Sequence, residues 1–206
     1  MDLEKLRMQL TEPLPGIKSQ LKMAPAHRVK EFSEVHTNDY NPRLSAVLVL
    51  LFHENEKLKI VFIRRSEYVG MHSGQIAFPG GRYEDFDADL RATAIREAEE
   101  EIGVKSETYE LLGHLTDLYV PPSNFLVRAY LAYTDKRPEF IIDKREVQEI
   151  LVVDYEQFKR QDVVKEKEFK IHNRTELTKA PYFDVDGVVI WGATAMLMSE
   201  LLDLDN

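Results

Sequence analysis

The chain has 206 residues, of which 44% are hydrophobic and 31% are charged, a composition typical of an ordinary globular protein. Its formal net charge of −9 disfavours long phosphate backbones, so we expect no nucleic-acid polymer as a partner. It contains no cysteine, which excludes disulfides, a thiol nucleophile and thiolate metal ligands.

We expect one domain over residues 1–206, because the length suits a single core and no repeat or linker divides the chain. No signal peptide and no run long enough to span a membrane are found, so no membrane partner is expected. The cysteine-free composition is compatible with the cytoplasm, where we place the protein. The oligomeric state stays open, with a homodimer as one alternative.

Residues 1–30 are expected to form an N-terminal helical arm of two short pieces, interrupted by Pro13 and Pro15. Basic side chains between Lys18 and Arg28 make this arm locally positive. Two interpretations remain open: an arm packed over the domain, or a segment that faces the substrate or a second subunit.

Residues 44–64 are predicted to form a β-hairpin. The run 44–52 is continuously apolar, which indicates a buried strand. The polar stretch 53–58 is expected to be the turn, and a second strand over 59–65 ends at Arg65.

Residues 78–104 carry the clearest structural prediction. The glycines at 80–81 allow a tight turn and a close approach of the backbone to a ligand. Asp87 or Asp89 can cap the helix that follows, and Gly103 is placed to end it. The apolar stripe of this helix recurs every four residues, at Leu90, Ala94, Ala98 and Ile102.

Three carboxylates gather on this predicted helix. At roughly 100° per residue, Glu97, Glu100 and Glu101 fall within about one turn and an arc of about 100°. Like charges this close repel each other, so we expect a cation to neutralise them. Carboxylate oxygens suit Mg²⁺ or Mn²⁺. The alternative is a solvated acidic helix face.

The rest of the chain adds short strands and one more helix. The expected strands, in order, cover residues 76–78, 109–120, 125–133 and 146–153, followed by a β-turn-β excursion over 163–189. Asp154 is expected to cap a short helix, and apolar residues at helical spacing predict a packing helix over 191–202. Strands on both sides of the central helix predict an α/β or α+β fold with a mixed sheet.

The order of residues around the carboxylates resembles the Nudix box, in which a glycine and an acid precede R-E-U-x-E-E-x-G-U, with U an aliphatic residue. The matching positions are Gly81, Asp87, Arg96, Glu97, Ala98, Glu100, Glu101, Gly103 and Val104. The acid is Asp87 where the general pattern has glutamate, and the spacer before Arg96 is one residue longer, which leaves the role of Asp87 open. The resemblance implies a sandwich of mixed β-sheet between helices and a metal-dependent hydrolase of pyrophosphate bonds.

A second string runs directly into the box and resembles a signature of coenzyme A pyrophosphatases: R-S-x6-H-x-G-Q-x-x-F-P-G-G. Its positions are Arg65, Ser66, His72, Gly74, Gln75, Phe78, Pro79, Gly80 and Gly81. The string over 190–195 is a weaker similarity. Family members commonly carry basic residues just before the histidine, where this chain has Gly70 and Met71.

These resemblances assign roles to individual residues. The expected metal ligands are Glu97, Glu100, Glu101 and, from a loop, Glu146. The expected catalytic residues are Glu97, Glu100 and Arg96, the arginine orienting a glutamate. The expected substrate-binding residues are Arg65, His72, Gln75, Gly80 and Gly81. Three of these have structural alternatives: Glu146 as a surface residue, His72 as a loop histidine bonded to nearby backbone, and Arg65 paired with Glu67 or Glu84.

The expected activity is hydrolysis of coenzyme A or its derivatives to 3′,5′-ADP and 4′-phosphopantetheine, with Mg²⁺ or Mn²⁺. One alternative is another nucleoside diphosphate derivative such as ADP-ribose, because such enzymes carry a proline about where Pro121 lies. A second is a non-catalytic binding module of the same fold. The intact Glu97, Glu100 and Glu101 argue against that module.

Overall fold

The computed structural model describes residues 2–26, 28–29, 41–67, 72–170 and 177–205. Its α-helices are α1 (Leu3–Gln9), α2 (Ile17–Gln20), α4 (Leu90–Ile102) and α5 (Gly192–Leu204). Short 3-10 turns are η1 (Leu21–Met23), η3 (Ser106–Thr108), η4 (Pro121–Ser123) and η5 (Tyr155–Lys159). Within the described ranges, no helix has the length and apolar character needed to cross a bilayer.

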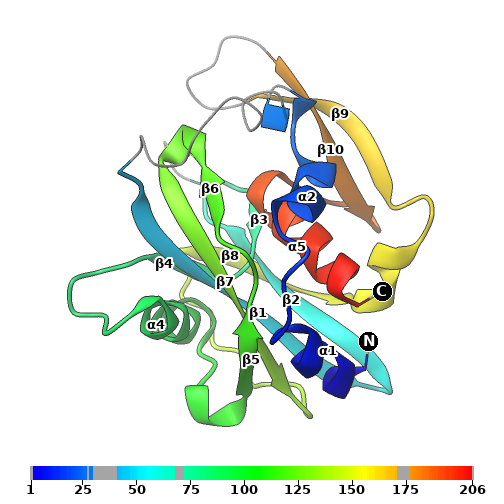
Figure 1. The fold of residues 1–206 in the computed structure, drawn as a ribbon. Helices are drawn as coiled ribbons and strands as arrows, with labels where there is room; N and C mark the ends of the chain where they lie inside the picture. Colours follow the sequence, from blue (N-terminus) through cyan, green and yellow to red (C-terminus); the bar gives the residue numbers. More distant parts are fainter. Residues whose placement is uncertain (1, 27, 30–40, 68–71, 171–176, 206) are drawn as a thin grey trace.

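The strands form two sheets (Figure 1). The strand bounds are β1 (Arg43–Glu54), β2 (Lys57–Arg65), β3 (Ile76–Ala77), β4 (Gly80–Arg82), β5 (Glu110–His114), β6 (Leu118–Val120), β7 (Phe125–Thr134), β8 (Val147–Asp154), β9 (Val164–Lys170), β10 (Leu177–Val185) and β11 (Val188–Trp191). The larger sheet has eight strands in the order β3-β2-β1-β7-β5, with β4 on β1, β6 on β7 and β8 on β2. Its β1–β7 pair is parallel and its other pairs are antiparallel, which confirms the predicted mixed sheet.

The predicted hairpin is present, but its turn is shorter than expected. His53 pairs with Leu58 and Glu54 pairs with Lys57, so only Asn55 and Glu56 form the turn. Both turn residues have positive φ, as in the tight turns that match strand twist. The polar residues flanking the turn stay in the ladder because their backbone groups pair regardless of side-chain polarity.

Strand β1 lies between two hydrophobic clusters, which explains its continuous apolar run. Leu48, Leu50 and Phe52 pack with Ala98 and Ile102 of α4 in one cluster, and the alternate residues of β1 pack in the other. The second cluster contains side chains of α1 and α5. Helix α4 therefore covers one side of the sheet and α1, α2 and α5 the other (Figure 1), because both faces of a buried strand need a partner.

Helix α4 has the bounds that the sequence predicted and buries three of the four residues of the predicted apolar stripe, while the fourth, Leu90, is only partly buried. Ala94, Ala98 and Ile102 are fully buried, and Gly103 ends the helix with φ 72°. The capping alternative is resolved in favour of Asp89, whose side chain accepts a hydrogen bond from the Ala92 N–H at 2.8 Å.

The C-terminal part differs from the prediction in two details. The excursion has a third strand, β11, paired with β10 in a sheet of order β11-β10-β9. The prediction that Asp154 caps the following helix was wrong, because that turn is a 3-10 turn without a side-chain cap. The Asp154 carboxylate instead pairs with Lys57 and Lys59 on the neighbouring strand.

The N-terminal arm packs against α5. Glu200, fully buried on α5, accepts hydrogen bonds from the Gly16 N–H at 3.2 Å, the Gln20 side-chain amide at 2.7 Å and the Thr116 N–H at 3.1 Å. Leu6 of α1 is 1% exposed. The arm is thus part of the packed structure, as the first interpretation expected, while Pro25 and Arg28 at its end line the cavity described below, so the second interpretation stays open.

Candidate metal and substrate site

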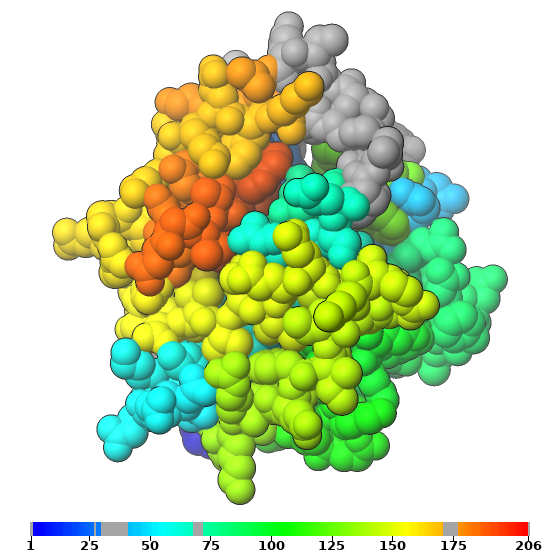
Figure 2. All heavy atoms as spheres, turned by 180° about the vertical axis from the view of Figure 1, so that it is seen from behind, coloured from blue at the N-terminus to red at the C-terminus, as the bar shows by residue number. Residues whose placement is uncertain are grey.

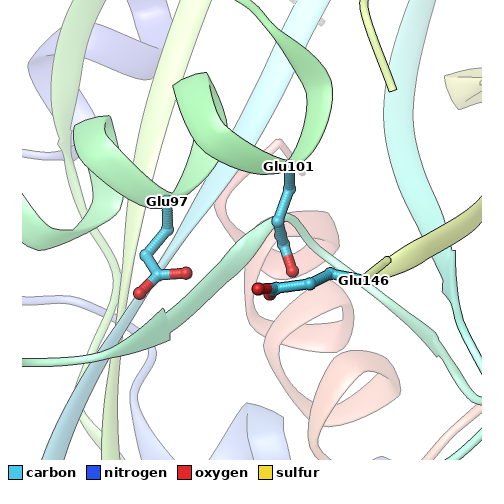
Figure 3. A group of neighbouring side chains, drawn as sticks. All are labelled: Glu97, Glu101 and Glu146. Atoms are coloured by element: carbon cyan, nitrogen blue, oxygen red, sulfur yellow. The ribbon is translucent and has the colours of Figure 1, made fainter. Parts of the chain in front are cut away.

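Three carboxylates from two elements meet at one end of α4 (Figure 3). Glu97 and Glu101 project from the helix, and Glu146 reaches toward them from the residue preceding β8. One oxygen from each lies within 4.8 Å of the other two. The loop carrying Glu146 is fixed by a hydrogen bond from the Ser66 N–H to the Glu146 carbonyl, at 2.8 Å.

Glu101 is the most buried of the three, with 1% of its surface exposed. Its Oε2 accepts a hydrogen bond from the Gly80 N–H at 2.8 Å, and its Oε1 has no hydrogen-bond partner among the described residues. The nearest cation to Oε1 is Arg65, whose Nη1 lies at 3.5 Å. Burial raises the pKa of Glu101 to about 8, although Gly80 and Arg65 act in the opposite direction. Burial also raises the pKa of Glu97, opposed by Arg96.

This donor set fits a hard divalent cation. Its groups are carboxylate oxygens close enough to share one ion, and Oε1 of the buried Glu101 has no hydrogen-bond partner among the described residues. Mg²⁺ and Mn²⁺ prefer such oxygen ligands. The residues present are therefore consistent with the expected metal.

The glycine pair ahead of the box is needed for two different reasons. A Cβ at Gly80 would lie 2.4 Å from the carbonyl oxygen of Ala46 on the paired strand β1. A Cβ at Gly81 would lie 2.4 Å from the Glu97 carboxyl group. Gly80 is thus required for strand packing, whereas Gly81 leaves the room that the Glu97 carboxylate occupies.

Arg96 links Asp87 to the carboxylate group. Its Nε and Nη2 each lie 2.9 Å from an Asp87 oxygen, and its Nη1 donates to Glu97 at 2.7 Å and to Glu100 at 3.1 Å. Asp87 also accepts from the Thr93 hydroxyl at 2.9 Å. The guanidinium holds the pKa of Asp87 well below its usual range. In this structure Asp87 therefore fixes Arg96, and Arg96 orients Glu97.

Glu100 does not join the other three carboxylates. Its side chain is 59% exposed and turns toward Arg96, so its expected role as a metal ligand and catalytic group stays a prediction. Glu146 is the carboxylate that the structure brings in instead, consistent with its predicted place in the ligand set.

A cavity of about 520 Å³ opens beside the glycine pair. All five predicted substrate-binding residues line it: Arg65, His72, Gln75, Gly80 and Gly81. Its described wall includes the cations Arg28, Arg65 and Arg82, contains no carboxylate, and is otherwise mostly apolar. Such a wall suits a ligand that carries an anionic group together with less polar parts.

Two predicted binding residues have specific partners. His72 Nδ1 lies 3.1 Å from Oε1 of Gln75, so it contacts a side chain rather than the backbone that the alternative expected. Burial lowers the pKa of His72, which favours a neutral ring. Arg65 pairs with Glu101, and Glu84, one of its two expected alternative partners, pairs with Arg82. Gly70 and Met71 lie outside the described residues.

Segments distant in sequence meet at this site. Figure 2 shows the segment near residues 72–77 (teal) between the β10–β11 region (orange) and the chain near residues 140–150 (yellow-green). The Thr194 hydroxyl ties the start of α5 to β3 through the Ile76 carbonyl, at 3.1 Å. Trp191, at the end of β11, also lines the cavity. Sequence reasoning assigned Trp191 no role, and its one signal was the weak similarity over 190–195.

Comparison with known proteins gives a family match over most of the chain. The family model described as NUDIX domain matches residues 42–174, which contain all the predicted catalytic, metal-binding and substrate-binding residues.

Curated relatives include two proteins named peroxisomal coenzyme A diphosphatase. The Caenorhabditis elegans protein ndx-8 is 34% identical over 134 residues, covering 64% of this chain and 57% of that protein. The Mus musculus protein NUDT7 is 31% identical over 137 residues, covering 66% of this chain and 56% of that protein. The matched region thus spans little more than half the length of these relatives.

Solved structures share the fold. A Nudix hydrolase from M. smegmatis, RenU, aligns with a TM-score of 0.52 at 12% identity, covering 79% of this chain and 86% of that one. A MutT/nudix family protein from Enterococcus faecalis aligns with a TM-score of 0.50 at 18% identity, covering 90% of this chain and 69% of that one.

Proposed function

Because the chain belongs to the Nudix family, we propose that it is a metal-dependent pyrophosphohydrolase acting on a small nucleoside diphosphate derivative. The substrate we propose is coenzyme A or one of its derivatives, cleaved to 3′,5′-ADP and 4′-phosphopantetheine. The observation that carries the proposal is the meeting of Glu97, Glu101 and Glu146 beside the glycine pair that borders an arginine-bearing cavity.

Different side chains of the site have different roles in the proposed hydrolysis. When bound, Mg²⁺ or Mn²⁺ supplies charge neutralisation at the pyrophosphate oxygens and a more acidic water. Glu97, Glu101 and Glu146 would hold that ion, and Arg96 fixes the position of Glu97. Arg65, at the border between the carboxylates and the cavity, binds phosphate oxygens through its guanidinium.

The reaction balances with one water molecule. The water oxygen forms a bond to one phosphorus, the bridging oxygen leaves with the other phosphorus, and a carboxylate of the site accepts the proton that the water loses. Each product then carries its own phosphate group.

Coenzyme A is favoured by two observations. The signature string places Arg65, His72 and Gln75 together on the cavity wall. The worm and mouse relatives are named coenzyme A diphosphatases, and this chain shares about a third of the aligned residues with each.

ADP-ribose is the second candidate, because Pro121 lines the same cavity. A non-catalytic binding module is disfavoured, since a pure binding module has no need for three carboxylates gathered within reach of one ion.

A substrate panel tests the proposal. Coenzyme A, ADP-ribose, NADH and dNTPs are incubated with Mg²⁺ or Mn²⁺, and kcat/KM is measured for each. We expect the highest value for coenzyme A, with 3′,5′-ADP and 4′-phosphopantetheine as products. A clear preference for ADP-ribose would establish the second candidate, and no turnover of any compound would support the binding module.

Location and assembly are further proposals from composition alone. We propose the cytoplasm, because the chain contains no cysteine, and we retain a homodimer as the alternative to a monomer. Cell fractionation tests the first proposal, and light scattering on the purified protein tests the second.

A further inference from the structure

Trp191 ends β11 immediately before α5 and forms part of the cavity wall. Its ring is stacked on Phe169 of β9, with ring centroids 4.0 Å apart and an interplanar angle of 10°. Because Phe169 covers one face of the indole, Trp191 presents its opposite face or its edge to the cavity.

The Phe169 ring is itself held from other sides. Tyr182 meets it edge to face, with centroids 6.0 Å apart, and the Lys167 ammonium lies 5.0 Å from each of the Phe169 and Tyr182 centroids. Phe169 is 8% exposed, although most of β9 is exposed. The stack is therefore fixed before any ligand arrives, which lowers the entropic cost of binding a flat group against it.

The Trp191–Phe169 stack and the glycine pair beside the carboxylates border the same cavity. Gln75 and Gly81 line the same cavity as Trp191, and the Thr194 hydroxyl bonds the Ile76 carbonyl. A ligand with its diphosphate at Gly81 can therefore extend into the space beside Trp191. Phe125 adds a further ring to this described part of the wall.

We propose that Trp191, backed by Phe169, is the stacking platform for the purine ring of the substrate. The proposal deepens the proposed function, on which it rests, by assigning the cavity to the nucleotide half of the substrate. The pantetheine half then extends outward from the diphosphate. A flat π-face is the feature that an aromatic side chain recognises on any base.

The competing assignment is that the stack only stabilises the three-stranded sheet and that the cavity holds the pantetheine arm. The two assignments differ in which half-substrate reaches Trp191, and half-substrates can be tested separately without any turnover.

The chain offers a direct probe, because Trp191 is its only tryptophan. Metal-free wild-type protein is titrated with 3′,5′-ADP, AMP or 4′-phosphopantetheine while indole fluorescence is recorded. We expect saturable quenching by 3′,5′-ADP and by AMP, and none by 4′-phosphopantetheine at matched concentrations. Quenching by 4′-phosphopantetheine alone, or by none of the three, would overturn the proposal. Because this assay needs no hydrolysis, its result is separate from that of the substrate panel.

Kinetics of variants provide the second test. Trp191→Leu should raise KM for the best panel substrate about 10-fold with little change in kcat, and Trp191→Phe should restore most of the loss, on the scale of one base-stacking contact. Leu177→Ala, at an exposed position in the same sheet, is the matched control. A lower Tm with unchanged KM in Trp191→Leu would overturn the proposal. If that variant does not fold, the wild-type titration decides.

Discussion

The two sides of the glycine pair are built by different kinds of interaction. On the α4 side, Glu97 and Glu101 are held by directional hydrogen bonds from Arg96 and from the Gly80 backbone. On the cavity side, Trp191 is held by stacking and packing. Directional hydrogen bonds fix charged atoms to fractions of an ångström. A packed aromatic ring instead tolerates small shifts in the position of a ligand that lies against it. We therefore expect the first side to control kcat and the second to control KM.

The largest effect is expected from Glu101→Gln, which removes a buried ligand charge but keeps the side-chain shape. The value of kcat should fall at least ~100-fold, on the scale of losing a metal or acid-base contribution. The fold should survive, because the apolar stripe of α4 is unchanged. Glu107→Gln, an exposed carboxylate in η3, serves as the control. Near-normal turnover in Glu101→Gln would contradict the assignment of Glu101 as a metal ligand.

Glu100→Gln sharpens this first prediction. From the sequence, the same loss of at least ~100-fold is expected if Glu100 is a ligand or a catalytic group. If Glu100 only pairs with Arg96, as in this structure, kcat should stay close to wild type. Steady-state kinetics of Glu100→Gln therefore decide whether Glu100 is a metal ligand or catalytic group, or only a partner of Arg96.

Substitutions at the two glycines should separate an effect on kcat from an effect on stability. In Gly81→Ala the new Cβ displaces the end of the flexible Glu97 side chain, so kcat should fall ~10- to 100-fold with a small change in Tm. In Gly80→Ala the new Cβ meets the backbone of β1, so Tm should fall clearly. The measurements are kcat and thermal melts of both variants. Equal loss of Tm in the two would contradict this separation.

Arg65 contacts Glu101 and also lines the cavity, so its variant tests whether this residue serves substrate binding or the structure of the site. Arg65→Ala should raise KM for phosphorylated substrates about 10-fold, because a charge-assisted contact to phosphate is lost, while Tm shifts little. Arg65→Lys should recover only part of the loss, because lysine cannot make two parallel hydrogen bonds. An unchanged KM in a destabilised Arg65→Ala protein would assign Arg65 a structural role.

The last prediction concerns how the stability of the metal-free protein changes with pH. Burial raises the pKa of Glu101 from 4.5 to about 8, so between these values the folded state holds a proton that the unfolded state has released. The contribution of Glu101 to the free energy of unfolding is therefore most favourable below about pH 4.5 and declines as pH rises to about 8. Thermal melts of wild type without metal should show this decline, and Glu101→Gln should show less of it. Identical pH dependence in both proteins would contradict the assignment.

Local periodicity was sufficient to predict α4, because Ala94, Ala98 and Ile102 repeat at helical spacing and are the apolar residues of the helix that become buried. It could not distinguish Glu100 from Glu101 as members of the group, since both lie within the same arc. The tertiary contacts separate them: Glu101 is buried against the Gly80 N–H, whereas Glu100 is exposed beside Arg96. The role of Asp87 also depended on that arginine, so it emerged only from the three-dimensional arrangement.

Contacts between distant segments set the remaining limits of prediction. The loop of Glu146 is held near α4 by hydrogen bonds from the Ser66 N–H to the Glu146 carbonyl and from the Asp143 N–H to the Glu101 carbonyl, and no local pattern encodes these long-range bonds. The Trp191 stack depends on the pairing of β9, β10 and β11, and the third of these strands was not predicted. The hairpin turn was predicted too long because side-chain polarity does not report backbone pairing.

The contact between the N-terminal arm and α5 has a consequence for synthesis on the ribosome. The Gly16 N–H and the Glu200 carboxylate that accepts its hydrogen bond are 184 positions apart, so the arm emerges from the ribosome long before its partner exists. Pro25, which follows the arm helices, forms part of the cavity wall. Nascent chains fold as their segments emerge, and a contact of such long sequence separation closes last. The cavity is therefore completed only after α5 has been translated, and a ribosome-bound chain that stops short of α5 lacks the part of the cavity wall that this helix supplies.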